Sequence, residues 1–239
     1  MTPSLLVQVL PDPEQTVTLN QEQTRYLTRV LRLGAGDTLF LFDGRGGRCR
    51  AVISDTNPKA VSLRCAAQVP VIPESPVHIT LLQGVPKGEK MDLIVQKASE
   101  LGVHSVVPVM TERTQVQKGD RTDRWRRVAE AAAAQCGRST VPSLAPVAPL
   151  RNALEGGTGK GVVFWEKASR PLSQCLHLKG LGELTILVGP EGGLTEREVT
   201  LAENAGLTRA GLGPRLLRTE TAAIVSVALI QYLFGDLGS

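Results

Sequence analysis

The stretch LVGPEGGLTEREV, residues 187–199, is laid out as the end of a buried strand, a glycine-rich loop and the start of a capped helix. Thr195 and Glu198 have the spacing of a capping box, in which side chains satisfy backbone N–H groups at a helix start. The loop before them holds three glycines, a proline and Glu191. A tight turn needs one glycine, whereas several glycines let the main chain approach a ligand closely. The stretch therefore predicts a ligand-binding loop at the end of a strand.

The sequence on either side of this stretch alternates between apolar runs and amphipathic segments. The runs show little polar alternation, which indicates strands buried on both faces and hence a parallel sheet covered by helices. We expect strands at residues 78–85, 103–110, 161–166 and 183–189. We expect helices at residues 88–102, 124–137, 194–206 and 222–234.

A second unusual stretch, LGPRLLRTETAA at residues 212–223, connects a short expected strand at residues 210–213 to a helix. Residues 219–221 suit the helix start, where side-chain oxygens accept hydrogen bonds from unpaired N–H groups. Arg215 and Arg218 fit poorly as helix-end solvators, because a helix N-terminus repels cations. Arginine can instead bind a phosphate or a planar acceptor through paired hydrogen bonds. Ligands of parallel sheets bind beyond the carboxyl ends of the strands, so we expect both loops to form one site.

The common phosphate-binding motifs do not occur in this sequence. Neither GxGxxG nor GxxxxGK[ST] is found, which argues against a dinucleotide fold and a P-loop. A carboxylate at Glu191 would repel a phosphate in the first loop. It favours a ligand that carries an ammonium group, a sulfonium group or hydroxyls.

The pattern of the first 72 residues predicts short strands that are separated by turns. Residues 40–44 and 48–54 flank several glycines and predict a hairpin. One helix is expected at residues 22–33, with an apolar stripe. The stripe consists of Tyr26, Leu27, Val30, Leu31 and Leu33. The proline-rich segment at residues 69–76 predicts a linker, so we expect a β-barrel-like domain over 1–72 and a second domain over 73–239.

The composition excludes several classes of protein. With 42% hydrophobic and 21% charged residues among 239, the chain is neither disordered nor fibrous. Aromatic residues make up only 3%, which argues against binding of single-stranded nucleic acid by a platform of stacked rings. The net charge of +4 is modest, but residues 113–138 are rich in arginine, which fits a solvated helix face and a phosphate-contacting surface equally well. The four cysteines and three histidines, His177 among them, lack metal or disulfide spacing. No segment is long enough to span a bilayer, so we expect a cytoplasmic protein without metal or membrane.

The two loop stretches together resemble the paired signature of the RsmE family. That family methylates N3 of a uridine (position 1498) in 16S ribosomal RNA with S-adenosylmethionine. The resemblance covers nearly the whole chain. It extends to YLTRVLRLGAGD and FDGRGG in the first domain, and to KGEKMDLIVQKASELGV, PVMTERT and EAAAAQCGRSTVP in the second.

The resemblance implies a fold that periodicity alone does not give. It implies an α/β chain with a small PUA-like β-barrel followed by a SPOUT methyltransferase domain, whose parallel sheet contains a trefoil knot. It also implies a homodimer with active sites at the subunit junction. Reasoning from the strand and helix pattern alone would give an unknotted doubly wound sheet, because true knots are rare. The apolar helix at residues 222–234 suits burial against a second subunit.

The resemblance also assigns the site residues. The cofactor, which leaves as S-adenosylhomocysteine, is expected to contact Glu166, Leu187, Gly189, Pro190, Glu191, Gly192, Gly193, Leu212, Gly213, Leu216, Leu217, Arg218 and Thr219. Our hypothesis for the catalytic pair is that Arg218 stabilises the uridine anion or holds its phosphate, and that Arg138, from the same or the partner subunit, orients the nucleotide. The expected contacts with 16S ribosomal RNA, or with the assembled small ribosomal subunit, are Arg25, Arg29, Arg32, Lys87, Arg113 and Arg138.

Two other functions remain open at this point. One is a ribosome-assembly factor that binds RNA without catalysis, because its PUA-like domain and basic segment would look the same. The other is a SPOUT methyltransferase that acts on transfer RNA. Thermal stabilisation by S-adenosylmethionine separates an enzyme from a binding module, since a ligand that binds the folded state raises the unfolding midpoint.

Overall fold

The computed structural model of the chain describes residues 2–115, 121–155, 159–175 and 182–238. Lys118 of the arginine-rich segment and His177 lie outside these residues. The chain divides into two units, residues 1–74 with 133–141, and residues 75–132 with 142–239. The boundary expected after residue 72 stays a prediction, and the grouping of residues 133–141 with the first unit was not anticipated.

The first unit is a five-stranded sheet in the order β1-β3-β4-β5-β2. Its strands are β1 (Ser4–Leu6), β2 (Thr16–Thr18), β3 (Thr38–Phe42), β4 (Arg48–Asp55) and β5 (Ser62–Gln68). β3 and β4 pair antiparallel, which confirms the predicted hairpin, whereas β1 pairs parallel to β3. Its core is aliphatic, and fully buried leucines such as Leu27, Leu39 and Leu63 lie at its centre.

The helix of the first unit differs from the predicted apolar stripe. α1 (Gln21–Arg25) begins with a capping box of Asn20 and Gln23 and continues into a π-helical turn over Tyr26–Val30. Leu27 is buried, but Tyr26 is 42% exposed and Val30 is 66% exposed. The stripe was wrong for these two residues because a π-turn bonds residue i to i+5, which rotates the following side chains away from a 3.6-residue period.

The second unit contains a sheet in the order β12-β10-β11-β6-β7-β8, and every pairing in it is parallel among the described residues. Its strands are β6 (His78–Gly84), β7 (Ser105–Met110), β8 (Ser143–Leu144), β9 (Ala148–Pro149, paired with β7), β10 (Gly161–Phe164), β11 (Glu183–Val188) and β12 (Leu207–Ala210). The predicted parallel sheet is confirmed. The short strand expected at residues 210–213 lies instead at Leu207–Ala210, so the residues after Ala210 are loop.

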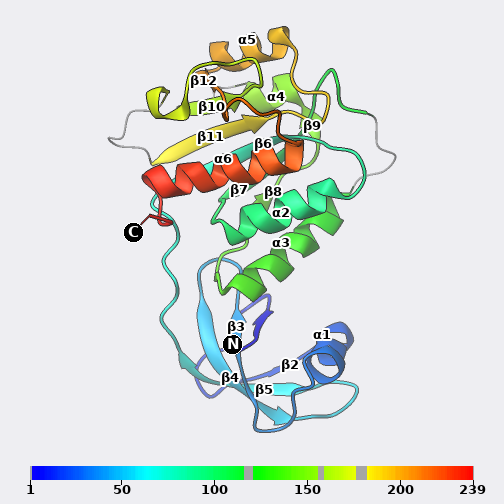
Figure 1. Cartoon of the computed structure of the whole chain (residues 1–239). Helices are drawn as coiled ribbons and strands as arrows, with labels where there is room; N and C mark the ends of the chain where they lie inside the picture. Colours follow the sequence, from blue (N-terminus) through cyan, green and yellow to red (C-terminus); the bar gives the residue numbers. More distant parts are fainter. Residues whose placement is uncertain (1, 116–120, 156–158, 176–181, 239) are drawn as a thin grey trace. The chain divides into compact units, whose positions relative to one another are not determined.

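Helices cover both faces of this sheet (Figure 1). The helices after residue 75 are α2 (Lys90–Glu100), α3 (Thr122–Cys136, whose last residues group with the first unit), α4 (Leu150–Leu154), α5 (Glu196–Asn204) and α6 (Thr219–Phe234), with a 3₁₀ turn at Leu172–Gln174. On one face Val163 and Leu187 pack with Leu150 of α4 and Val199 of α5. Because side chains alternate along a strand, their sequence neighbours point to the other face, where α6 contacts both β11 and α2. The capping box predicted for α5 is present.

Among the described residues no helix is long and apolar enough to cross a membrane.

Candidate functional site

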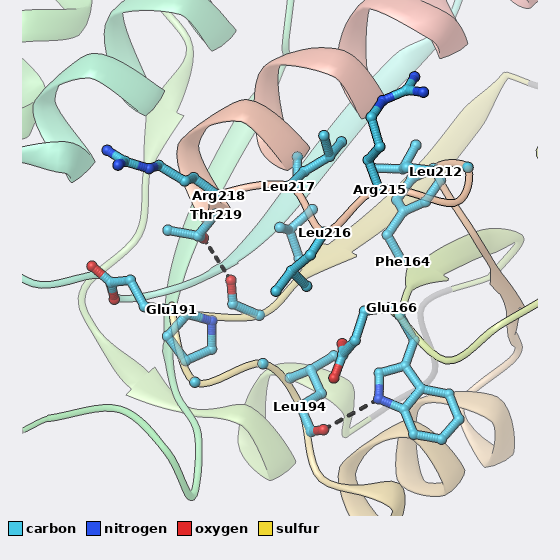
Figure 2. Close-up of a pocket in the computed structure, with 18 of the residues that line it drawn as sticks. Phe164, Glu166, Glu191, Leu194, Leu212, Arg215, Leu216, Leu217, Arg218 and Thr219 are labelled. Atoms are coloured by element: carbon cyan, nitrogen blue, oxygen red, sulfur yellow. Dashed lines mark hydrogen bonds between the residues drawn. The ribbon is translucent and has the colours of Figure 1, made fainter.

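The loops after β11 and β12 meet at the carboxyl edge of the parallel sheet. Thr219, the first residue of α6, donates a hydrogen bond from Oγ1 to the carbonyl oxygen of Gly189 over 2.6 Å (Figure 2). The hydroxyl expected to cap α6 is therefore directed to the other loop, and α6 begins without a side-chain cap. This contact brings together the two stretches that the sequence singled out.

Gln83, at the end of β6, joins the same contact from below the loops. Its side chain is fully buried, and Nε2 donates to the carbonyl oxygen of Gly84 over 2.9 Å, to Thr219 Oγ1 over 3.1 Å and to the carbonyl oxygen of Gly189 over 3.5 Å. Gln83 Oε1 is buried and has no hydrogen-bond partner within the described part of the chain. The Nε2 assignment is consistent with its neighbours, because the atom faces carbonyl oxygens that can only accept. Gln83 thus fixes the distance between the two loops.

The carboxyl end of β10 lies between the loops because β10 separates β12 from β11 in the sheet. Phe164, Trp165 and Glu166 follow from this strand and line one side of a cavity of about 670 Å³. Trp165 is buried, and its Nε1 donates to the carbonyl oxygen of Leu194 over 3.3 Å. The indole therefore holds the end of the first loop beside the end of β10 (Figure 2).

Two glycines have backbone conformations that other residues rarely adopt. Gly193 has φ +69°, and a Cβ there would lie 3.1 Å from Glu166 Oε1. Gly213 has φ +95° and open space where a side chain would be. Both line the cavity, so the sharp bends of the loops depend on glycine at these positions.

Glu191 lines the cavity, but its carboxylate is already bound by the protein. Lys90 Nζ lies 2.8 Å from its Oε1, and the backbone N–H of Lys87 donates to both carboxylate oxygens over 3.0 and 3.2 Å. Burial alone would raise the pKa of Glu191, but these hydrogen bonds outweigh burial and lower it. The Lys90 pKa is raised, chiefly by the hydrogen bond to Glu191. Glu191 is thus a paired carboxylate that anchors the loop.

Glu166 differs from Glu191 in this respect. Its exposed side chain lines the cavity and points toward the loop that contains Gly193 (Figure 2). Within residues 2–115, 121–155, 159–175 and 182–238 its carboxylate makes no hydrogen bond or ion pair. Glu166 is therefore the carboxylate of the cavity that is free to pair with a positively charged group of a ligand.

Most of the predicted cofactor contacts line this one cavity. They are Glu166, Gly189, Pro190, Glu191, Gly192, Gly193, Leu212, Gly213, Leu216, Leu217, Arg218 and Thr219. Leu187 does not line it, because its side chain is fully buried on the face of β11 that packs against α5. Sequence reasoning missed Gln83, Lys90, Phe164, Trp165 and Leu194. Lys90 belongs to a quoted motif, but its partner Glu191 is far away in sequence, and no local pattern connects them.

The predicted RNA contacts fall into different settings. Arg25, Arg29 and Arg32 are exposed in the first unit, and Lys87 is exposed in the second. Arg113 is also exposed, but its guanidinium donates to the carbonyl oxygen of Gly192 over 2.7 Å and so supports the first loop.

Arg138 is placed differently from the other arginines. It is only 8% exposed, and its guanidinium donates to both carboxylate oxygens of Glu74 over 2.6 and 3.2 Å. It does not line the cavity. Its position indicates an ion pair within the first unit between a buried guanidinium and the more exposed carboxylate of Glu74.

Comparisons with known proteins agree with this geometry. Residues 73–231 match the family described as RNA methyltransferase domain, and residues 19–64 match the RNA methyltransferase PUA domain. The ribosomal RNA small subunit methyltransferase E of Bacillus subtilis is 32% identical over 231 residues, which cover 91% of this chain and 90% of that protein. The same-named protein of Buchnera aphidicola is 31% identical over 232 residues, which cover 94% and 91%.

Solved structures give the same result. A ribosomal RNA small subunit methyltransferase E from Neisseria gonorrhoeae, bound to S-adenosyl methionine, has a TM-score of 0.92 and 33% identity, and the match covers 99% of this chain and 100% of that one. A putative methyltransferase from Legionella pneumophila, in complex with the bound cofactor SAM, has a TM-score of 0.91 and 32% identity with the same coverage. The predicted fold class, a SPOUT α/β domain preceded by a PUA-like domain, is confirmed.

Proposed function

Because the chain belongs to the ribosomal RNA small subunit methyltransferase E family, we propose that it methylates N3 of a uridine, at position 1498, in 16S ribosomal RNA. The methyl donor is S-adenosylmethionine, and the product is S-adenosylhomocysteine. The observation that carries this proposal is the cavity formed where the two loops are joined by Thr219 and Gly189.

The lining of this cavity fits a nucleoside with a sulfonium group. Its volume of about 670 Å³ is in the range of small-molecule sites. Leu216 lines it and is 84% exposed, so a flat ring that covers part of this side chain would gain hydrophobic free energy. Main-chain groups of the glycine loops suit the edges of the adenine and ribose, and Glu166 suits a positive group. When bound, S-adenosylmethionine supplies an electrophilic methyl group.

The protein's own part in the reaction is to position the uridine and to stabilise charge. N3 carries a proton and becomes a nucleophile only when that proton leaves, so the site must stabilise a developing anion. Arg218 is exposed at the cavity and, within the described residues, makes no ion pair, so we assign it this role. The sequence hypothesis gave Arg138 a second role at the nucleotide. We do not extend the proposal to Arg138, because its guanidinium is paired with Glu74.

The partners that we propose are the RNA of the small ribosomal subunit and a second copy of this chain, in the cytoplasm. For RNA, the exposed cations Lys87 and Arg113 flank the first loop. For the homodimer, Leu229, Tyr232 and Leu233 of α6 are exposed although α6 is an apolar helix. Sedimentation should give a dimer for the native chain and a monomer for Tyr232→Glu. A native monomer would rule out this dimer.

The function is tested in two steps. S-adenosylhomocysteine should raise the thermal midpoint of the chain, because it binds the folded state alone. The purified chain should then add one methyl group to small subunits from cells that lack this modification, and mass analysis of nuclease fragments locates the base. No midpoint shift and no methylation would favour the RNA-binding assembly factor, and methylation of transfer RNA instead would favour the other SPOUT activity.

A further inference from the structure

Lys90 lies between two carboxylates that belong to different elements. It is the first residue of α2, and its Nζ lies 2.8 Å from Glu191 in the loop after β11 and 3.8 Å from Glu220 Oε2 in the first turn of α6. Glu220 Oε2 is buried and has no hydrogen bond in the part of the chain that the structure describes. Lys90 is therefore the cation that faces both carboxylates, and we call these three residues the Lys90 cluster.

Arg218 borders the Lys90 cluster. It precedes Glu220 by two residues, and Figure 2 shows its side chain and that of Glu191 extending toward the same side of the cavity. The positive charge of Arg218 acts on Lys90 and partly opposes the rise of its pKa, which comes chiefly from the hydrogen bond to Glu191. Yet Arg218 makes no ion pair with Glu191 or Glu220. The carboxylates nearest to it are occupied by Lys90.

The charges explain why that occupation matters. The Lys90 cluster and Arg218 together contain two cations and two carboxylates, so this side of the cavity is balanced. Without Lys90, Arg218 would be the one cation beside the carboxylates of Glu191 and Glu220, and the net charge of these three groups would be −1. Glu191 would keep the backbone N–H of Lys87, but neither carboxylate would have a cation, and an arginine beside such carboxylates can form bidentate hydrogen bonds with one of them. The same guanidinium could then no longer meet a phosphate or an anionic base.

We propose that Lys90 is a positioning residue for methyl transfer: by binding Glu191 and Glu220 it keeps the Arg218 guanidinium available for the RNA. This inference rests on the proposed function, in which Arg218 acts on the uridine or its phosphate. The competing explanation is that Lys90 only holds the first loop in place. The two explanations differ in what happens when the carboxylates are removed as well.

The test compares Lys90→Met with the triple variant Lys90→Met/Glu191→Gln/Glu220→Gln. The single variant should lower kcat/KM for small subunits about tenfold, which corresponds to about 1.4 kcal/mol. The triple variant also lacks the ion pairs of Lys90, but it has no carboxylates at positions 191 and 220 that could bind Arg218. Its activity should therefore recover to roughly a third of the native value or more. A matched control is Lys97→Met, which also lies on α2. Lys97 has a side-chain exposure of 37% against 35% for Lys90, and each lysine pairs with a glutamate at 2.8 Å.

A second readout follows Arg218 directly and needs neither cofactor nor RNA. Phenylglyoxal modifies unpaired guanidinium groups, and peptide mass analysis gives the rate at Arg218. This rate should fall in Lys90→Met and return in the triple variant. Native activity in Lys90→Met would overturn the proposal, and so would a triple variant as inactive as the single one, because only loop-holding predicts that. A native chain that methylates no RNA would count against the proposed function, while the phenylglyoxal rates still decide the role of Lys90.

Discussion

Replacing Gln83 by methionine should weaken cofactor binding without lowering stability. The substitution keeps the length and approximate volume of a fully buried side chain, so it creates no large cavity. It removes the hydrogen bonds of Nε2 to Gly84 and to Thr219 Oγ1. It also removes Oε1, a buried acceptor without a partner among the described residues.

The sizes of these effects nearly cancel for folding but not for binding. Two short hydrogen bonds at about 0.5–1.5 kcal/mol each are lost together with the weaker one to Gly189 at 3.5 Å, and relief of one unsatisfied buried acceptor returns about 1–3 kcal/mol. The free energy of unfolding should therefore change by less than about 1 kcal/mol. The support that Gln83 gives to the Thr219–Gly189 contact is still lost, and one such bond is equivalent to a roughly 2- to 13-fold weaker Kd.

Gln231→Met is the matched control, because Gln231 is equally buried and lies away from the cavity. Both of its amide atoms are bonded, to Ser75 Oγ and to the carbonyl oxygen of Leu101, each over 2.7 Å. Its removal relieves no unsatisfied atom and should lower the free energy of unfolding by about 2 kcal/mol. Urea unfolding and calorimetric titration with S-adenosylhomocysteine give both quantities for each variant. The reasoning fails if Gln83→Met loses stability and keeps its Kd, which is the pattern expected of Gln231→Met.

Three further predictions concern the same cavity. Arg218→Ala should reduce methyl transfer about a hundredfold, the cost of one lost oxyanion donor, with the cofactor Kd retained; unchanged turnover with labelled cofactor would remove Arg218 from the mechanism. Gly213→Ala and Gly36→Ala place a side chain at φ +95° and +88° in open space, so each should cost about 1–2 kcal/mol in denaturant unfolding, but only Gly213→Ala should weaken cofactor binding. The lowered pKa of Glu191 contributes stability that is present above its ordinary value of 4.5 and lost as the pH falls through the native pKa. The stability advantage of the native chain over Glu191→Gln should therefore shrink on acidification, and an advantage that is constant from pH 6 to 3 would contradict this.

The sequence predicted those features that depend on local chemistry. Apolar runs without polar alternation gave β6, β7, β10 and β11, and the Thr195 and Glu198 pair gave the start of α5, because both signals lie within one element. The glycine loops were found for the same reason. Local patterns also caused an error. The predicted stripe assumed a regular α-helix at Tyr26 and Val30, and the spacing of apolar residues does not reveal the π-turn that rotates these side chains.

Features that depend on pairing between distant segments could not be predicted. Gln83 and Lys90 act on Thr219 and Glu191, which are more than a hundred residues away, and a single glutamine or lysine carries no sign of such a partner. Arg138 shows the converse, since a lone arginine in a basic segment looks like an RNA contact and its RNA role stays a prediction. Its ion pair with Glu74 depends on how the chain returns to the first unit.

The order of the strands explains why the two loops enclose a cavity and do not form one continuous surface. β11 and β12 follow each other in sequence, but β10 lies between them in the sheet. The loop after β12 must therefore pass the end of β10 before Thr219 can reach Gly189, and the space beneath that passage is lined by Phe164, Trp165 and Glu166. If β12 paired directly with β11, the Thr219 contact could form with no strand end beneath it, and Glu166 would lie outside the site. With this strand order, the hydrogen bond between the loops closes the pocket. A change at Gln83 that loosens this contact should therefore affect ligand binding more than stability.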